Sequence, residues 1–194
     1  ATTGATDSFA PEGTRRKWLL RNDGDGVFTD VTAESGILAL RFSDDPLAAR
    51  PGEVTAAADV DNDGDVDVFI GHSVSEPGPG LETSEIMLNQ GDGTFVLGPE
   101  ESGLRSPDAQ QIPAGASFVD VNRDGFVDIW VPQNMAAGAT APLNDRLYLG
   151  DGTGSFTEVT QEAGLTTKAW NYISDLNEGL AHSWAWSALA CDLN

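Results

Sequence analysis

Residues 59–67 read Asp-Val-Asp-Asn-Asp-Gly-Asp-Val-Asp, and residues 120–128 repeat this pattern as Asp-Val-Asn-Arg-Asp-Gly-Phe-Val-Asp. The two acidic stretches begin 61 residues apart, and residues 192–194, Asp-Leu-Asn, begin a third. A chain that returns to one pattern at a regular interval is built from structural repeats. The repeat is therefore the main indication of the fold, because it shows which segments occupy equivalent positions.

A second pattern recurs in step with the first. Glycine-rich turns that end in phenylalanine lie at residues 19–28, 87–95 and 147–156. These turns lack the fifth- and ninth-position carboxylates of the acidic stretches, so we expect them to be hairpin turns. Each is followed by a segment that ends in glycine and an aliphatic residue, which predicts a short helical turn ended by glycine. These segments are residues 31–37, 100–104 and 159–165.

The segments between the turns are short, apolar and rich in β-branched residues, as strands require. One unit is predicted to contain strands at residues 54–58, 66–71, 85–89 and 94–97, and a second unit runs in the same order from residue 116 to residue 159. Four antiparallel strands in a repeat of this length describe a propeller blade better than a solenoid coil. The predicted fold is all-β, with β-propeller blades of four antiparallel strands in a partial propeller.

The repeats divide the chain into successive parts. We expect an N-terminal extension, the outer strands of one blade with a connector, two blades that each carry an acidic loop, and the inner strand of an incomplete blade. The corresponding ranges are residues 1–17, 18–50, 51–112, 113–182 and 183–194.

The acidic loops have the spacing of a calcium site. Calcium takes six to eight oxygen ligands, and the pattern offers side-chain oxygens at positions 1, 3, 5 and 9, a carbonyl at position 7, and a turn-forming glycine at position 6. In the first loop the expected ligands are the side chains of Asp59, Asp61, Asp63 and Asp67 and the carbonyl of Asp65. In the second they are the side chains of Asp120, Asn122, Asp124 and Asp128 and the carbonyl of Phe126. The first loop has one carboxylate more, so we expect it to bind Ca²⁺ more tightly.

Two other interpretations of the loops compete with this one. An EF-hand needs a bidentate glutamate at position 12 and flanking helices, but position 12 is Ile70 in one loop and Val131 in the other, between β-like segments. An ordinary Asp/Gly surface turn explains one such cluster, but it does not explain two copies at matching points of a repeat. Calcium binding is favoured over both.

The overall charge excludes some partners. The formal net charge is −21, which argues against binding nucleic acid or an anionic membrane surface. No apolar run reaches the length of a membrane span, and the single cysteine, Cys191, allows no intrachain disulfide.

The loops and the strands around them resemble the FG-GAP/VCBS repeat, the blade of integrin α-subunit β-propellers and of many secreted bacterial proteins. Residues 113–120, Pro-Ala-Gly-Ala-Ser-Phe-Val-Asp, are similar to the segment that leads into the family's calcium loop, and residues 147–160 are similar to the bacterial variant. The resemblance implies a calcium-stabilised propeller in a secreted, cell-surface or periplasmic setting, often in adhesion or as a scaffold. It does not imply one activity.

The number of predicted blades is too small for a closed ring. Propellers close with about four to eight blades, and the third acidic stretch stops after Asp192 and Asn194. We therefore expect the remaining blades to come from a longer chain or from neighbouring subunits.

Two classes of function remain open on the sequence. The first is a non-catalytic adhesion, interaction or assembly module with a protein or glycan partner, for which the insertion at residues 166–182, with Trp170 and Tyr172, is a candidate contact. The alternative is part of a secreted propeller enzyme, a polysaccharide lyase or hydrolase. The only histidines are His72 and His182. A histidine that acts as a catalytic base needs a partner group held beside it, and the sequence shows no such partner for either one. We therefore expect no catalytic site in this chain.

Overall fold

The computed structural model describes residues 17–43, 52–74, 82–105, 110–134 and 143–165. These ranges form ten strands and no helix, which confirms the all-β prediction. The predictions made for residues 1–16 and 166–194 lie outside the described residues; they include the insertion with Trp170 and Tyr172, His182, Cys191 and the third acidic stretch.

The first described element is a two-stranded hairpin. Strand β1 (Leu20–Gly24) pairs antiparallel with β2 (Val27–Asp30), and Phe28 lies opposite Asn22. The tight turn passes through Asp25 at φ 51° with glycines at positive φ on either side, as the Asp/Gly sequence predicts.

The second sheet has the strand order β3-β4-β5-β6 and is antiparallel throughout. Its strands are β3 (Gly52–Ala58), β4 (Asp67–His72), β5 (Glu85–Asn89) and β6 (Phe95–Leu97). Ala58 pairs with Asp67, so the first acidic loop joins β3 to β4 at one end of the sheet.

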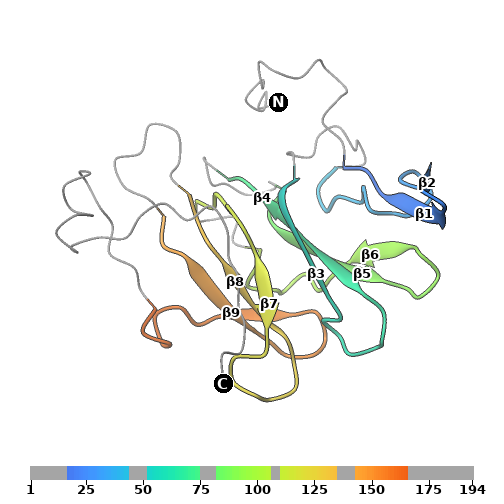
Figure 1. Cartoon of the computed structure of the whole chain (residues 1–194). Coiled ribbons are helices and arrows are strands. Elements are labelled where there is room, and N and C mark those ends of the chain that lie inside the picture. The colour runs from blue at the N-terminus through green and yellow to red at the C-terminus, as the bar shows by residue number, and fades with distance from the viewer. Residues whose placement is uncertain (1–16, 44–51, 75–81, 106–109, 135–142, 166–194) are drawn as a thin grey trace.

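The third sheet repeats this arrangement. Its strands are β7 (Ser117–Val119), β8 (Asp128–Val131), β9 (Arg146–Gly150) and β10 (Phe156–Glu158), joined in the order β7-β8-β9-β10. Val119 pairs with Asp128, which places the second acidic loop at the position of the first. Figure 1 shows the hairpin, the second sheet and the third sheet following one another across the molecule. The two four-stranded sheets are consistent with propeller blades.

The core lies between successive sheets. One buried cluster joins the second and third sheets, and a smaller one joins the hairpin's connector to the second sheet. The larger cluster consists of Val60, Phe69, Ile86, Leu104, Ile129, Val131, Tyr148 and Phe156. The smaller consists of Ile37, Ile70 and Met87. The second sheet thus buries apolar side chains on both faces, Phe69 and Ile86 on one and Ile70 and Met87 on the other, as a blade stacked between two others does.

The glycine-ended turns follow the prediction in two copies of three. Gly36 and Gly164 have φ of 75° and 70°, the left-handed conformation that ends a helical turn. Gly103, in the middle copy, is not among the described residues at positive φ. The prediction that a left-handed conformation explains this glycine is therefore wrong. Gly103 is required by a close approach of the backbone, because a Cβ on it would lie 2.7 Å from the carbonyl oxygen of Phe156.

Candidate metal centre

The two acidic loops fold alike. Asn62 and Arg123, at position 4, have φ of 59° and 64°, and Gly64 and Gly125, at position 6, have φ of 95° and 91°. Two left-handed residues two positions apart curl each loop, and glycine and asparagine adopt this conformation at low cost. The asparagine amide Nδ2 of the first loop also donates to the carbonyl of Gly125 at 3.4 Å, so the loops of neighbouring sheets touch.

The first-position aspartate organises each loop. In the first loop, Asp59 accepts the backbone N–H groups of Asp63 and Gly64, both at 3.1 Å. In the second, Asp120 accepts those of Asp124 at 3.2 Å and Gly125 at 3.0 Å. The side chain therefore draws the later loop residues back over itself, as an Asx-type turn does.

The ninth-position aspartate ties the loop to the sheet. The side chain of Asp67 is fully buried and accepts the N–H of Val60 and the N–H of Asn89, each at 2.8 Å. Asp128, also fully buried, accepts the equivalent N–H groups of Val121 at 2.9 Å and Gly150 at 3.0 Å. The sequence predicted these aspartates as metal ligands, but it did not indicate that they also fasten the loop to β5 or β9.

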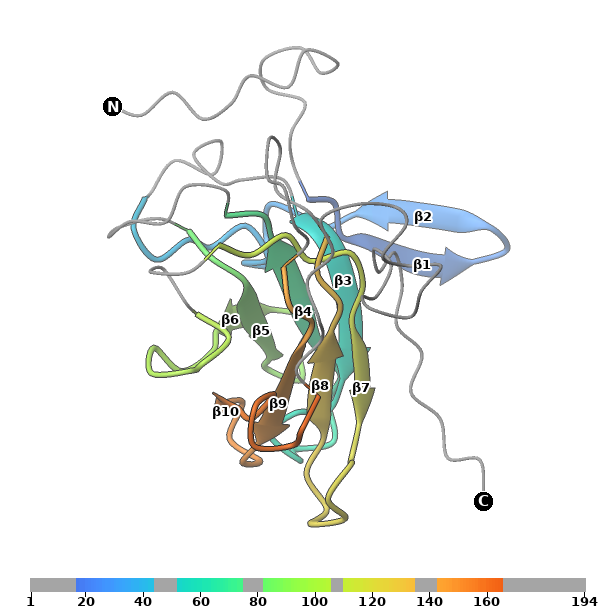
Figure 2. The ribbon, with the colours of Figure 1, turned by 90° about the vertical axis from the view of Figure 1, so that its left-hand side faces the viewer.

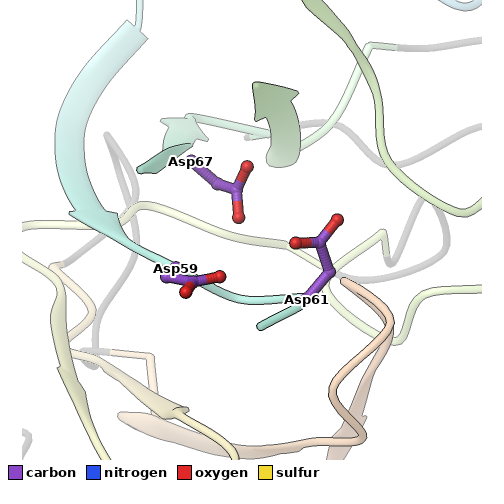
Figure 3. A group of neighbouring side chains, drawn as sticks. All are labelled: Asp59, Asp61 and Asp67. Atoms are coloured by element: carbon purple, nitrogen blue, oxygen red, sulfur yellow. The ribbon is translucent and has the colours of Figure 1, made fainter. Parts of the chain in front are cut away.

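Three carboxylates converge in the first loop. Asp59, Asp61 and Asp67 each offer an oxygen, and these oxygens lie within 4.8 Å of one another. Figure 3 shows the three carboxylates around a common space. Among the described residues, the buried Oδ1 atom of Asp61 has no hydrogen-bond partner. A buried carboxylate oxygen without a partner is costly, and a cation in this space would satisfy it. The residues therefore fit a hard cation such as Ca²⁺.

The electrostatics of the cluster agree with its geometry. Burial, followed by the charges of Asp67 and Asp63, raises the pKa of Asp61. Burial also raises the pKa of Asp67, although the two N–H groups that it accepts act in the opposite direction. Both carboxyl groups thus resist ionisation in the metal-free protein, and a bound cation would reverse that preference.

The other two expected ligands of the first loop, the side chain of Asp63 and the carbonyl of Asp65, are not part of this three-carboxylate group. Asp63 is exposed and accepts the N–H of Asp65 at 2.9 Å. The carboxylate of Asp65 lies against the β5–β6 turn, where a Cβ on Gly91 would come within 2.7 Å of it. The structure therefore brings together positions 1, 3 and 9 and leaves position 5 at the rim.

The second loop differs at position 3. The Asn122 amide Nδ2 donates to Asp124 Oδ2 at 2.8 Å, so an amide stands where the first loop has Asp61. In the part of the chain that the structure describes, the three-carboxylate group is found in the first loop alone. Burial, followed by the charges of Asp124 and Asp120, still raises the pKa of Asp128. Phe126 covers Gly152 of the β9–β10 turn, leaving no room for a side chain there.

His72 lies in the interior of the second sheet. It is 1% exposed at the end of β4, and its backbone N–H donates to Ser84 Oγ at 3.2 Å. This position is remote from solvent.

Comparison with known proteins bears on one part of the chain. Residues 59–131 match the family model described as the FG-GAP-like repeat. Neither the curated proteins nor the solved structures give a match to the chain. The described residues contain no helix long and apolar enough to cross a membrane. The matched range starts at Asp59 and ends with β8, so the similarity covers the stretch from the first acidic loop through the strand after the second.

Proposed function

We propose that this chain is a calcium-binding, calcium-stabilised module of β-propeller blades that acts as an extracellular adhesion, interaction or assembly scaffold. The observation that carries the proposal is the convergence of Asp59, Asp61 and Asp67 around the buried, unpartnered Asp61 Oδ1. Carboxylate and carbonyl oxygens on a curled loop are the ligand set of a hard cation, and Ca²⁺ tolerates the irregular geometry of such a loop better than Mg²⁺ does.

The proposed role of the ion is structural. Each loop joins the first two strands of a sheet, and its ninth-position aspartate already fastens it to the third strand. A cation held at this point ties three strands together and neutralises part of the −21 charge. Calcium that binds only the folded state adds about 2.7 kcal/mol of stability at one hundred times its dissociation constant.

Calorimetric titration with CaCl₂ and thermal melts with and without EDTA test the proposal. We expect two bound Ca²⁺ ions per chain, the tighter one in the first loop, and a melting temperature that EDTA lowers and Ca²⁺ restores. A melt unchanged by EDTA together with no measurable heat of binding contradicts the proposal.

Two reciprocal substitutions locate the sites. Asp61→Asn gives the first loop the third-position amide of the second, and Asn122→Asp gives the second loop the carboxylate of the first. The first change is expected to weaken the tighter site, and the second change to strengthen the weaker one. Asp25→Asn, in the exposed β1–β2 turn, removes one charge away from both loops and should leave both affinities unchanged.

The extracellular location is proposed because Ca²⁺ is present there at about millimolar concentration, which is enough to fill calcium sites of modest affinity. The proposal assigns no catalytic role to this chain. A polysaccharide-cleaving activity that is lost in the His182→Ala variant would contradict that assignment.

A further inference from the structure

The contact between successive sheets is made twice by the same two sequence elements. One is the glycine-ended turn that follows the last strand of a sheet, and the other is the phenylalanine that starts the last strand of the next sheet. In the first joint, Phe95 N–H donates to the carbonyl of Ser35 at 2.7 Å, and a Cβ on Gly36 would overlap the Phe95 carbonyl oxygen. In the second, Gly103 N–H donates to the carbonyl of Phe156 at 2.7 Å.

Apolar side chains close each joint. The aliphatic residue after the glycine is buried in both, Ile37 at 5% and Leu104 at 2% exposure. Two residues of the receiving hairpin pack in these clusters: Phe95 with the buried Met87 in the first joint, and Phe156 with Tyr148 in the second. Each joint therefore consists of a turn whose aliphatic residue packs in a cluster with the phenylalanine of the receiving hairpin and a large apolar side chain of the same hairpin.

One half of a further joint is exposed on the β1–β2 hairpin. By strand register, Leu20 corresponds to Met87 and Tyr148, and Phe28 corresponds to Phe95 and Phe156. Yet Leu20 is 52% exposed and Phe28 is 57% exposed. We call these two residues the hairpin face.

The other half is exposed at the last turn, residues 159–165. Leu165, the counterpart of Ile37 and Leu104, is 40% exposed. No atom of the described residues outside its chain neighbours lies within 4 Å of a Cβ placed on Gly164. The third copy of the turn thus lacks, within the described structure, the receiving hairpin that the first two copies have.

The last turn already has the conformation that docks in the first joint. Val159 N–H donates to the Leu147 carbonyl at 2.9 Å, and Ala163 N–H donates to the Val159 carbonyl at 2.8 Å. The first turn makes the same two bonds, from Val31 to Leu19 at 3.0 Å and from Ser35 to Val31 at 3.1 Å. Thr32 and Thr160 occupy the same place in the two turns. The Thr32 hydroxyl accepts the N–H of Leu19 at 2.8 Å, and the Thr160 hydroxyl accepts the N–H of Leu147 at 2.9 Å. A preformed turn costs little entropy on binding.

We propose that the hairpin face of one chain binds the last turn of a second copy of this chain, head to tail, with the register of the two internal joints. The hairpin and the end of β10 lie on opposite sides of the described structure in both views (Figures 1 and 2). The two halves are different surfaces, so the contact is heterologous and continues into a ring or an open string of chains. It extends the scaffold role proposed above, but it does not depend on bound calcium for its contacts.

Sedimentation velocity of the full chain over a range of concentrations tests this proposal, in calcium and in EDTA. Wild-type chains should form concentration-dependent oligomers. Phe28→Asp and Leu165→Asp should each raise the apparent dissociation constant about 30-fold or more, the effect of losing a buried anchor at the centre of an interface. Val96→Asp, at a 45% exposed valine of β6 outside any joint, is the matched control and should associate as wild type does.

Mixing the two variants gives the sharper result. Each keeps one intact half, so an equimolar mixture of Phe28→Asp and Leu165→Asp chains should form a dimer of one chain of each kind and stop there. The proposal is overturned if wild type stays monomeric at its highest soluble concentration, or if both aspartate variants associate like wild type. A mixture that remains monomeric also overturns it. These outcomes are read from mass and partner choice, so they are distinct from failure of the calcium titration.

Discussion

Asp61 and Asp67 lie in the same loop but stabilise it in different ways. Asp67 is buried with both oxygens accepting backbone N–H groups, so it holds the loop whether or not a cation is present. Asp61 has a buried oxygen with no partner among the described residues. Its contribution therefore depends on what occupies the space between the carboxylates.

This difference predicts a change of sign for Asp61→Asn. The pKa of Asp61 is raised in the folded chain by burial and by its acidic neighbours, so without a cation the ionisation of this carboxyl group lowers the stability of the folded state. The substitution should raise the melting temperature in EDTA and lower it in saturating Ca²⁺. Equal shifts of one sign in both buffers would contradict the role given to this residue.

Asp67→Ala is expected to destabilise in both buffers. It leaves the N–H groups of Val60 and Asn89 without their acceptor, and each buried unpaired donor costs about 1–3 kcal/mol. Urea denaturation should show the loss in EDTA and a loss at least as large in Ca²⁺. A urea midpoint of Asp67→Ala in EDTA equal to that of wild type would contradict the role of Asp67 in fastening the loop to the sheet.

The raised pKa values of Asp61 and Asp67 also predict a pH dependence for the metal-free protein. A carboxyl group whose folded pKa exceeds its unfolded value binds its proton more tightly in the folded state. Its contribution to stability therefore falls as the pH rises from the unfolded pKa through the raised folded pKa. Melts in EDTA should show this component, and it should be reduced in Asp61→Asn.

At the level of secondary-structure elements, the contact between successive sheets can be tested through the glycines of the turns. Gly36 and Gly164 share a left-handed φ, but only the first lies against a neighbouring strand among the described residues. Both alanine substitutions carry the same conformational cost, so their difference isolates the joint. In dilute protein, Gly36→Ala should be more destabilising than Gly164→Ala by about 1–3 kcal/mol, as for an overpacked contact. Equal losses of stability in the two variants would mean that the backbone around Phe95 moves to admit the methyl group at no measurable cost.

A buried ion network connects the same elements. Glu85 on β5 accepts Arg41 Nε at 2.7 Å and Arg105 Nε at 2.8 Å, and these side chains are 7%, 13% and 9% exposed. Arg41 comes from the segment after the hairpin, and Arg105 from the turn after β6. The network therefore joins three segments that are separate in the sequence.

Glu85→Gln should lower the free energy of unfolding by about 3 kcal/mol, because it leaves two buried guanidinium groups without their shared counter-ion. Chemical denaturation measures this. The control is Asp23→Asn, which breaks the exposed Arg21–Asp23 pair and should leave the midpoint at the wild-type value. A Glu85→Gln midpoint equal to that of the control would contradict the network's role.

At the scale of the whole molecule, charge is the dominant feature. A net charge of −21 opposes compaction, and salt screens such repulsion over about 8–10 Å at moderate ionic strength. NaCl should therefore raise the melting temperature in EDTA by more than it does in saturating Ca²⁺, where bound ions have removed part of the charge. An equal salt effect in both buffers would show that the loops are not where the repulsion is concentrated.

The repeat, the all-β fold, the order of the strands and the position of the acidic loops between the first two strands of each sheet could all be predicted from the sequence. These follow from local causes: alternating apolar residues, Asp/Gly turns and ligand spacing act over a few residues, so they can be read along the chain. The loop conformation belongs here as well, since Gly64 and Gly125 occupy the positive-φ positions that the pattern requires.

Which carboxylates meet, and which residues each turn contacts, depend on tertiary packing. Asp61 and Asp63 have equal standing in the sequence, yet only Asp61 joins Asp59 and Asp67, because the curl of the loop directs the third position inward and leaves the fifth at the rim. Gly103 looks like a helical-turn glycine, but the approach of Phe156 from 53 residues away explains it. Such contacts depend on how whole sheets pack, and spacing along the chain carries no record of that packing.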